Sequence, residues 1–180
     1  GDLADTITMG AGADSLTPGG GADKIYYTFV TPANAATESG AATGDTDYVL
    51  NTAGDTINGF VSGTDKIYIK ATAVTNAKGT EADTLLTIGA AGTITNAARF
   101  VEITAAFDGT TGDAVTDLAA ATTTAVESAD SVVVFMHDST DGYLFLVEEA
   151  GTGSIQAGEV TLIAKIAGVT DIANGDLVSY

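Results

Sequence analysis

A nine-residue repeat at the start of the chain constrains its fold more than any other feature of the sequence. Asp5, Asp14 and Asp23 are nine positions apart, and each is followed two positions later by a large aliphatic residue. A fixed short period of this kind is typical of solenoids, in which each repeat forms one turn and buries its apolar side chains against neighbouring turns. The sequence therefore predicts stacked short strands over residues 1–27. The aliphatic residues of the repeat are Ile7, Leu16 and Ile25.

Glycine occupies two further fixed positions of the repeat. A glycine-rich half can turn tightly through backbone angles that a Cβ atom would forbid, and this brings backbone carbonyl oxygens close together. An aspartate carboxylate beside those carbonyls makes an oxygen cage of the kind that Ca²⁺ prefers. The alternative is a plain Gly/Asp turn between hairpin strands, which three copies in register disfavour. The glycines are Gly1, Gly10 and Gly19 at the second position of the repeat and Gly12 and Gly21 at the fourth.

The repeat resembles the nonapeptide G-G-x-G-x-D-x-U-x, with U a large aliphatic residue, of the RTX family of secreted bacterial proteins. This resemblance implies a parallel β-roll whose successive turns alternate between two sides. The first turn would then lie beside the third, so that Asp5 and Asp23 line one shared calcium site. Asp14 would need a partner turn from elsewhere, and we expect it at residues 44–47. The departures from the template are Leu3 in place of a glycine at the fourth position, and Met9 and Pro18 in place of the first glycine.

A second motif, at residues 54–69, is similar to the segment that closes the roll in serralysin-type proteases and their relatives. Tyr68 and Lys70 replace the family's further acidic residues, which leaves a calcium ligand at that point without support. Asp55 and Asp65 have two interpretations, as calcium ligands or as residues that only cap turns. The matching residues are Asp55, Ile57, Phe60, Gly63, Asp65 and Ile67.

The candidate calcium ligands are thus aspartates and the turn glycines between them. Ca²⁺ is the one cofactor that the sequence suggests, because the carboxylates of so acidic a chain repel one another unless a cation neutralises them. The candidate metal-site residues are Asp5, Asp14, Asp23, Asp45, Asp47, Asp55 and Asp65, with Gly10, Gly12, Gly19 and Gly21.

The middle of the chain mixes strand-like and helix-like patterns. Residues 31–45 have no periodicity and predict a loop. Three short strands are expected at residues 46–52, 55–60 and 65–71. Helix-like patterns occur at residues 95–107 and 111–128, which are either short helices packed on the sheet or insert loops exposed as a partner surface. Of these, we expect a helix at 113–127.

The C-terminal part is predicted to be β-structure. The runs 131–137 and 143–149 flank the turn sequence DSTDG and predict a hairpin, and 160–166 predicts a further strand. Residues 168–172 are similar to the closing stretch of type I secretion target domains. The predicted fold is mainly all-β: a short parallel β-roll that continues into a β-sandwich-like C-terminal part, with one or two short helices. We expect a roll domain at residues 1–70 and a β-rich domain at 71–180.

Charge and composition exclude several classes of function. The chain has 24 Asp and Glu against six Lys and Arg, a net charge of −18, so nucleic acid and anionic membranes are poor partners. It has no cysteine and one histidine, and it has no phosphate-loop, dinucleotide or zinc-protease motif. We therefore expect no enzyme. The chain begins in the middle of a repeat, which predicts that it is part of a longer protein.

The RTX resemblance implies a calcium-dependent structural module of a secreted bacterial cell-surface protein, either a surface layer or an adhesin. Its expected location is extracellular, and its expected partners are calcium ions, further copies of itself or a cell-surface polysaccharide. One alternative is the secretion and folding domain of an RTX protease or lipase, and another is a glycan- or ice-binding adhesin module. Four tyrosines are either a carbohydrate-stacking surface or ordinary packing residues. They are Tyr26, Tyr27, Tyr48 and Tyr68.

Overall fold

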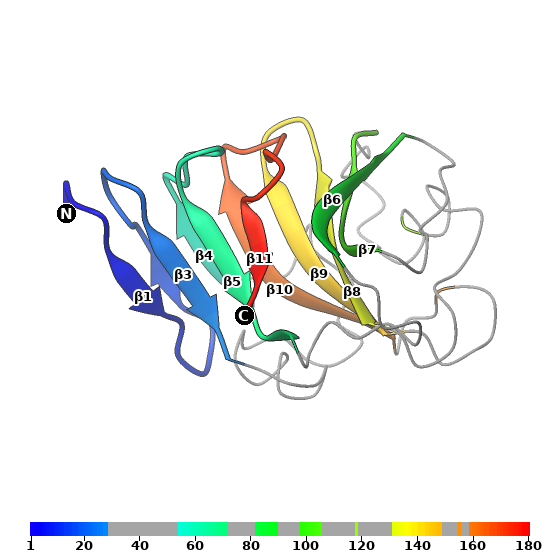
Figure 1. The fold of residues 1–180 in the computed structure, drawn as a ribbon, viewed down its shortest axis with the longest axis horizontal. Coiled ribbons are helices and arrows are strands. Elements are labelled where there is room, and N and C mark those ends of the chain that lie inside the picture. The colour runs from blue at the N-terminus through cyan, green and yellow to red at the C-terminus, as the bar shows by residue number, and fades with distance from the viewer. Residues whose placement is uncertain are drawn as a thin grey trace.

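The computed structural model confirms an all-β fold. The structure describes residues 1–28, 54–71, 82–89, 98–105, 131–148 and 159–180, together with Leu118 and Ile155. Figure 1 shows the strands side by side along the long axis, with the N-terminus at one end. The strands are β1 (Thr6–Thr8), β2 (Ser15–Leu16), β3 (Lys24–Tyr27), β4 (Asp55–Asn58), β5 (Lys66–Ile69), β6 (Ala82–Ile88), β7 (Ala98–Ile103), β8 (Ser131–His137), β9 (Gly142–Glu148), β10 (Val160–Ala167) and β11 (Leu177–Ser179).

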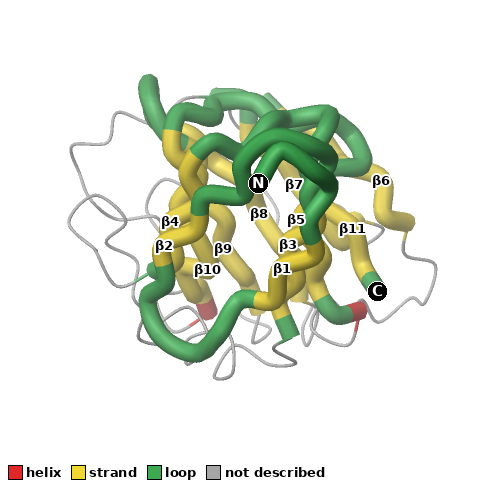
Figure 2. Tube along the Cα trace, turned by 90° about the vertical axis from the view of Figure 1, so that its left-hand side faces the viewer, coloured by secondary structure: helices red, strands yellow, loops and turns green. Residues whose placement is uncertain are grey.

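The first strands of the chain alternate between two sheets. A four-stranded sheet has the order β1-β3-β5-β11, and a seven-stranded sheet has the order β2-β4-β10-β9-β8-β7-β6. Every pair in the four-stranded sheet is parallel, and β2, β4 and β10 are also parallel to one another. Figure 2, seen from the N-terminal end, shows the two sheets facing each other, and we call them the two walls of the roll. The predicted β-roll is therefore confirmed, with the first turn beside the third.

The repeat's aliphatic residues fill the space between the walls. Ile25, Ile57 and Ile67 are fully buried, whereas Ile7, on the outermost turn, is only half-buried. Because side chains alternate along a strand, Lys24 and its neighbours at even spacing face outward. Each buried aliphatic side chain contributes about 1.5–3 kcal/mol relative to an exposed one.

The same interior continues into the C-terminal part. The predicted hairpin is confirmed, since β8 and β9 pair antiparallel, and β10 pairs with β9 on one side and with β4 on the other. β11 extends the four-stranded sheet from β5. Residues from both sides of the predicted boundary at residue 70 thus share both sheets and one core cluster.

The central strands β8 and β9 of the seven-stranded sheet are buried on both faces. β8 alternates between two clusters, because Val133 and Phe135 pack toward the four-stranded sheet whereas Val132 and Val134 pack on the opposite side. Leu118 and Ile155 belong to the second cluster. This double burial explains the continuous apolar run of β8, which is typical of a strand covered on both faces.

One expectation needs correction, and one pair of alternatives is resolved. The helix-like pattern at residues 95–107 is wrong, because Ala98–Ile103 forms β7, in which Phe100 faces one core cluster while Val101 and Ile103 face the other. That division has the period of a strand. Tyr27 is fully buried between the sheets, so of its two interpretations the structure supports that of a packing residue.

Several expectations fall on residues that the structure does not describe. They are the loop at 31–45, the strand at 46–52, Tyr48, and the helix at 113–127 apart from Leu118, which is buried. β6 was not predicted. Among the described residues, no helix is long and apolar enough to span a membrane.

Candidate metal centre

Aspartates stand at the same place in successive layers of the roll. Asp5, Asp23 and Asp65 directly precede β1, β3 and β5, which are neighbours in the four-stranded sheet. On the other wall, Asp14 precedes β2 and Asp55 begins β4. The nine-residue spacing thus places the carboxylates in two columns, one along each wall.

Each column is joined by hydrogen bonds between layers. Asp23 Oδ1 accepts a bond from the backbone N–H of Asp5 at 2.8 Å, and Asp65 Oδ1 accepts one from the N–H of Asp23 at 2.9 Å. On the other wall, Asp55 Oδ1 accepts a bond from the N–H of Asp14 at 2.8 Å. These carboxylates therefore satisfy the backbone of the adjacent turn and fix the register between turns.

The partner of Asp14 differs from our expectation. Asp55 lies in the adjacent layer, since β2 pairs with β4 in register Ser15 to Thr56. The expected partner turn at residues 44–47, with Asp45 and Asp47, lies outside the described residues.

Asp65 acts as a turn cap with both of its oxygens. Its Oδ1 binds the N–H of Asp23, and its Oδ2 accepts the N–H of Val61 at 2.8 Å. Of the two interpretations of Asp65, this geometry supports the cap, because backbone donors already occupy the carboxylate.

Asp176 is a further acidic residue at this edge that sequence reasoning missed. Its carboxylate accepts bonds from the N–H of Gly63 at 2.9 Å, the hydroxyl of Ser62 at 2.8 Å and the N–H of Ala173 at 2.8 Å. The sequence signal is weak, since Leu177 follows Asp176 directly instead of two positions later.

Asp23 differs from Asp65, because one of its oxygens has no hydrogen-bond partner. The residue is fully buried, its Oδ1 caps Asp5, and its Oδ2 is buried without a partner. A buried carboxylate oxygen that lacks a donor costs several kcal/mol unless a cation or a proton compensates it. Asp23 Oδ2 is therefore the strongest candidate for a metal ligand in the described part of the chain.

The turns beside Asp23 approach so closely that only glycine fits. A Cβ atom on Gly19 would lie 2.2 Å from the carbonyl oxygen of Gly1, and one on Gly21 would lie 2.5 Å from the carbonyl carbon of Leu3. Both glycines have positive φ angles, 106° and 115°. The repeat's glycines thus let the main chains of two layers pack directly against each other, and the N–H of Gly20 donates to the carbonyl oxygen of Gly1 at 2.7 Å.

Gly10 and Gly12 play related parts in the second turn. A Cβ atom on Gly10 would lie 3.3 Å from Asp14 Oδ2, so the carboxylate packs directly over this glycine. Gly12 has a φ of 107° but open space around it. A glycine is favoured at this position by the backbone conformation alone and not by a close neighbour.

The donor set favours a hard cation. Among the described residues, no three His, Cys, Asp or Glu side chains gather closely enough to hold a metal by themselves. A cation here would be held by main-chain carbonyls with one or two carboxylates, the all-oxygen environment that suits Ca²⁺. Asp23 and Asp5, with the carbonyl groups of the turns at residues 1–5 and 19–23, are oxygen donors of that kind.

Comparisons with known protein families, curated proteins and solved structures found no match to this chain.

Proposed function

We propose that this chain is a calcium-dependent structural module of a secreted bacterial cell-surface protein, of the surface-layer or adhesin type. The observation that carries the proposal is Asp23 Oδ2, a buried carboxylate oxygen without a hydrogen-bond donor beside a close-packed pair of glycine turns. The aligned aspartates and the parallel roll support it further. The surface-layer or adhesin role and the extracellular location rest on the RTX resemblance of the repeats.

The proposed mechanism couples folding to calcium binding. Without calcium, a chain of charge −18 repels itself, and its glycine turns have much conformational entropy to lose. Calcium would bind the turns only when they are stacked, so it stabilises the folded state by mass action, by about 2.7 kcal/mol per site at a hundredfold excess over Kd. Extracellular modules bind calcium at roughly 10⁻⁴–10⁻³ M, so folding would be completed outside the cell.

Calcium titration tests this proposal. We expect calorimetry to detect calcium binding, and the midpoint of thermal unfolding to rise with calcium concentration and to fall in excess chelator. Magnesium at the same concentration is the control, because it demands a smaller octahedral site and keeps its waters. An unfolding curve that is identical in millimolar calcium and in chelator would contradict the proposal.

A further inference from the structure

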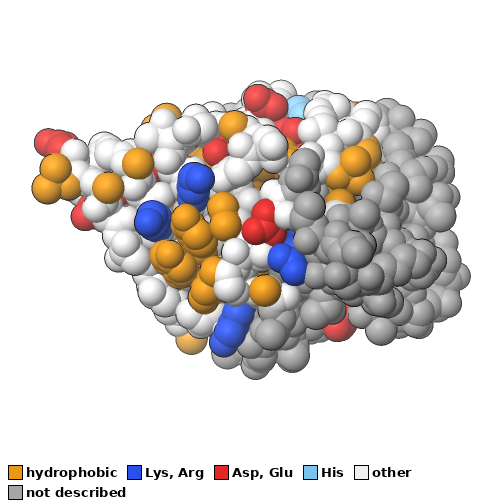
Figure 3. Space-filling view, in the orientation of Figure 1, with side chains coloured by type: hydrophobic (Ala, Val, Ile, Leu, Met, Phe, Trp, Pro, Cys, Tyr) orange, Lys and Arg blue, Asp and Glu red, His pale blue; other side chains and the backbone are white. Residues whose placement is uncertain are grey.

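The outward face of the four-stranded sheet carries aromatic and basic side chains that are not part of the candidate metal centre. Along β3 and β5, Ile25 and Ile67 are buried, while the alternate residues face outward. Figure 3 shows hydrophobic side chains over this sheet with Lys and Arg around them. We call this surface the tyrosine face; it is formed by Tyr26, Tyr68, Tyr180, Lys24, Lys66 and Lys70.

The three tyrosines form one continuous group. Tyr26 and Tyr68 are register partners on adjacent strands, and their rings stack at 4.5 Å with an angle of 11°. Tyr180 meets Tyr26 edge-on at 5.1 Å, and 46% of Tyr180 is exposed. The hydroxyl of Tyr180 donates to the carbonyl oxygen of Tyr27 at 3.2 Å, which fixes this ring on the surface. The result is a rigid, partly exposed aromatic stripe across β3 and β5.

The lysines of this face are placed side by side. Lys24 and Lys66 are register partners on the parallel strands β3 and β5, and both are exposed. Neighbouring strands are about 4.8 Å apart, and like charges directly opposite each other destabilise a sheet. In the part of the chain that the structure describes, neither lysine forms an ion pair, although the chain has 24 acidic residues. An anionic ligand would remove this repulsion.

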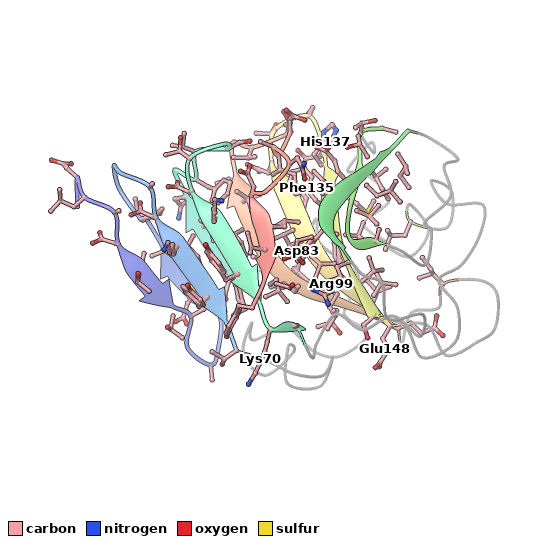
Figure 4. All side chains as sticks on the ribbon, viewed as in Figure 1. Lys70, Asp83, Arg99, Phe135, His137 and Glu148 are labelled. Atoms are coloured by element: carbon pink, nitrogen blue, oxygen red, sulfur yellow. The ribbon has the colours of Figure 1, made fainter. Side chains whose placement is uncertain are left out.

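The tyrosine face has the opposite charge to the rest of the molecule. Three of the chain's six lysines and arginines lie in it, whereas the whole chain has a charge of −18. Figure 4 shows Lys70 at the end of the face, and Arg99 beside Asp83 at its border. Arg99 and Asp83 form an ion pair at 3.2 Å, so the lysines are the cations available to a ligand.

We propose that the tyrosine face binds an anionic polysaccharide. Tyrosine rings offer apolar area to the C–H groups of sugars and hydroxyls to their oxygens. Lysine ammonium groups bind carboxylate or sulfate substituents by charge-assisted hydrogen bonds. Thr6 and Thr8 on β1 are exposed and extend the wall with further hydroxyl groups. The net charge of −18 disfavours broad anionic surfaces, but charges more than about 8 Å from an exposed group are largely screened at physiological salt, so a narrow polyanion that lies along the stripe interacts mainly with the lysines. A second copy would instead bring a broad surface and its own charge of −18 against the first.

The test uses the whole chain at one fixed free calcium concentration. Dextran sulfate, hyaluronate and unsulfated dextran of matched length are titrated against the protein by calorimetry. We expect one or both of the charged polymers to bind, and the affinity to fall as salt is raised because the ion pairs are exposed. Unsulfated dextran should bind at least about tenfold more weakly than the charged polymer.

Two variants test whether binding depends on the tyrosine face itself or only on the net charge of the protein. Lys24→Gln with Lys66→Gln should weaken binding about tenfold, because two exposed ion pairs with the ligand are lost. Tyr68→Leu, which retains apolar contact in the stripe, should weaken it as well. The control is Lys165→Gln, which removes one positive charge from an ion pair with Asp141 elsewhere on the fold and is matched in charge to Lys24→Gln or Lys66→Gln alone.

The outcomes separate this proposal from calcium-dependent folding. Circular dichroism of each variant reports whether the fold is intact, and calcium titration reports on the turns. Because Lys24 and Lys66 directly follow Asp23 and Asp65, Tyr68→Leu, which is further from the turns, is the variant that should lose polysaccharide binding with its calcium response unchanged. Equal binding by the Lys24/Lys66 variant and the Lys165 variant would overturn the proposal. Self-association that the tyrosine-face variants abolish, seen by sedimentation, would overturn it in favour of a second copy.

Discussion

Asp23 Oδ1 accepts the backbone N–H of Asp5 at 2.8 Å, across 18 residues of sequence. This bond gives the aspartate of the repeat a structural role that does not depend on a bound cation. It holds the first and third turns in register with one carboxylate oxygen and leaves the other, Oδ2, buried and without a partner. One side chain thus serves the backbone and offers an oxygen to a cation.

Replacing Asp23 by Asn should remove calcium-dependent stabilisation. The amide keeps an oxygen for the N–H of Asp5 but loses the charge that a cation needs, so we expect the calcium-induced rise in unfolding temperature to shrink. Asp2→Asn is the control, because Asp2 is an exposed residue of the facing turn and loses the same charge. Thermal unfolding with and without calcium measures both. An equal calcium response in the two variants would show that Asp23 is not a ligand.

Replacing Gly21 by Ala should destabilise the roll strongly. Its φ of 115° costs an L-residue about 1–2 kcal/mol, and the new Cβ would collide with the main chain of Leu3. Gly12→Ala is a matched control at the same repeat position, since its φ is 107° and its surroundings are open. We expect chemical denaturation to give a loss of about 3 kcal/mol or more for Gly21→Ala, and about 1–2 kcal/mol for Gly12→Ala. Equal losses would mean that the close approach of the turns is unimportant.

The repeat predicted the roll well because its information is local. Two nine-residue repeats return the chain to the same side of the roll, so the 18-residue spacing of Asp5 and Asp23 implies that β1 pairs with β3. The partner of Asp14 was not predictable in this way. Asp55 is 41 residues further on, and its choice depends on how a segment without repeats returns the chain to the roll.

The remaining errors have a common physical cause. β7 was read as helix-like because its mixed sequence shows no clear alternation, and only burial on both faces of a large sheet makes a strand of it. Asp176 was missed because β11 joins the four-stranded sheet from the far end of the chain, with its aspartate one residue out of the repeat's spacing. Both the strand β7 and the position of Asp176 therefore depend on contacts between segments that are far apart in the sequence.

The hairpin turn between β8 and β9 should depend on Asp138. Its Oδ1 accepts the N–H groups of Thr140 and Asp141 at 2.6 and 2.7 Å, and its Oδ2 accepts the hydroxyl of Tyr143 at 3.0 Å. Asp138→Ala leaves these donors without the carboxylate and should cost about 1–3 kcal/mol in denaturant unfolding. Asp138→Asn, which keeps the acceptor for the two N–H groups, should cost less. An unchanged stability in the alanine variant would contradict this role.

Asp138 should also make the stability of the fold depend on pH, with the stability falling in acid. Although partial burial opposes ionisation of Asp138, the hydrogen bonds from Asp141, Thr140 and Tyr143 outweigh it and lower its pKa. A carboxyl group with a lowered pKa in the folded state stabilises the protein above its ordinary value of 3.8, and this contribution is lost as the pH falls through the folded value. The stability difference between the native chain and Asp138→Asn should therefore narrow in acid, which unfolding measurements at several pH values would detect.

Glu102 on β7 should show the opposite behaviour. Burial raises its pKa, and the charge of Asp171 raises it further, while the N–H of Ile172 at 3.2 Å only partly compensates. The unfolded chain then loses its proton first as the pH rises above about 4.5, so this residue reduces stability between its unfolded and folded pKa values and at every higher pH. We expect Glu102→Gln to be more stable than the native chain at neutral pH, with the gain vanishing below the ordinary pKa, because the amide keeps an acceptor for Ile172 and carries no charge. Thr87→Val, which removes only the weak 3.4 Å bond to Glu102 Oε2, is the control and should leave the pH profile close to native. A neutral-pH stability of Glu102→Gln below that of the native chain would show that the buried charge contributes favourably to the fold.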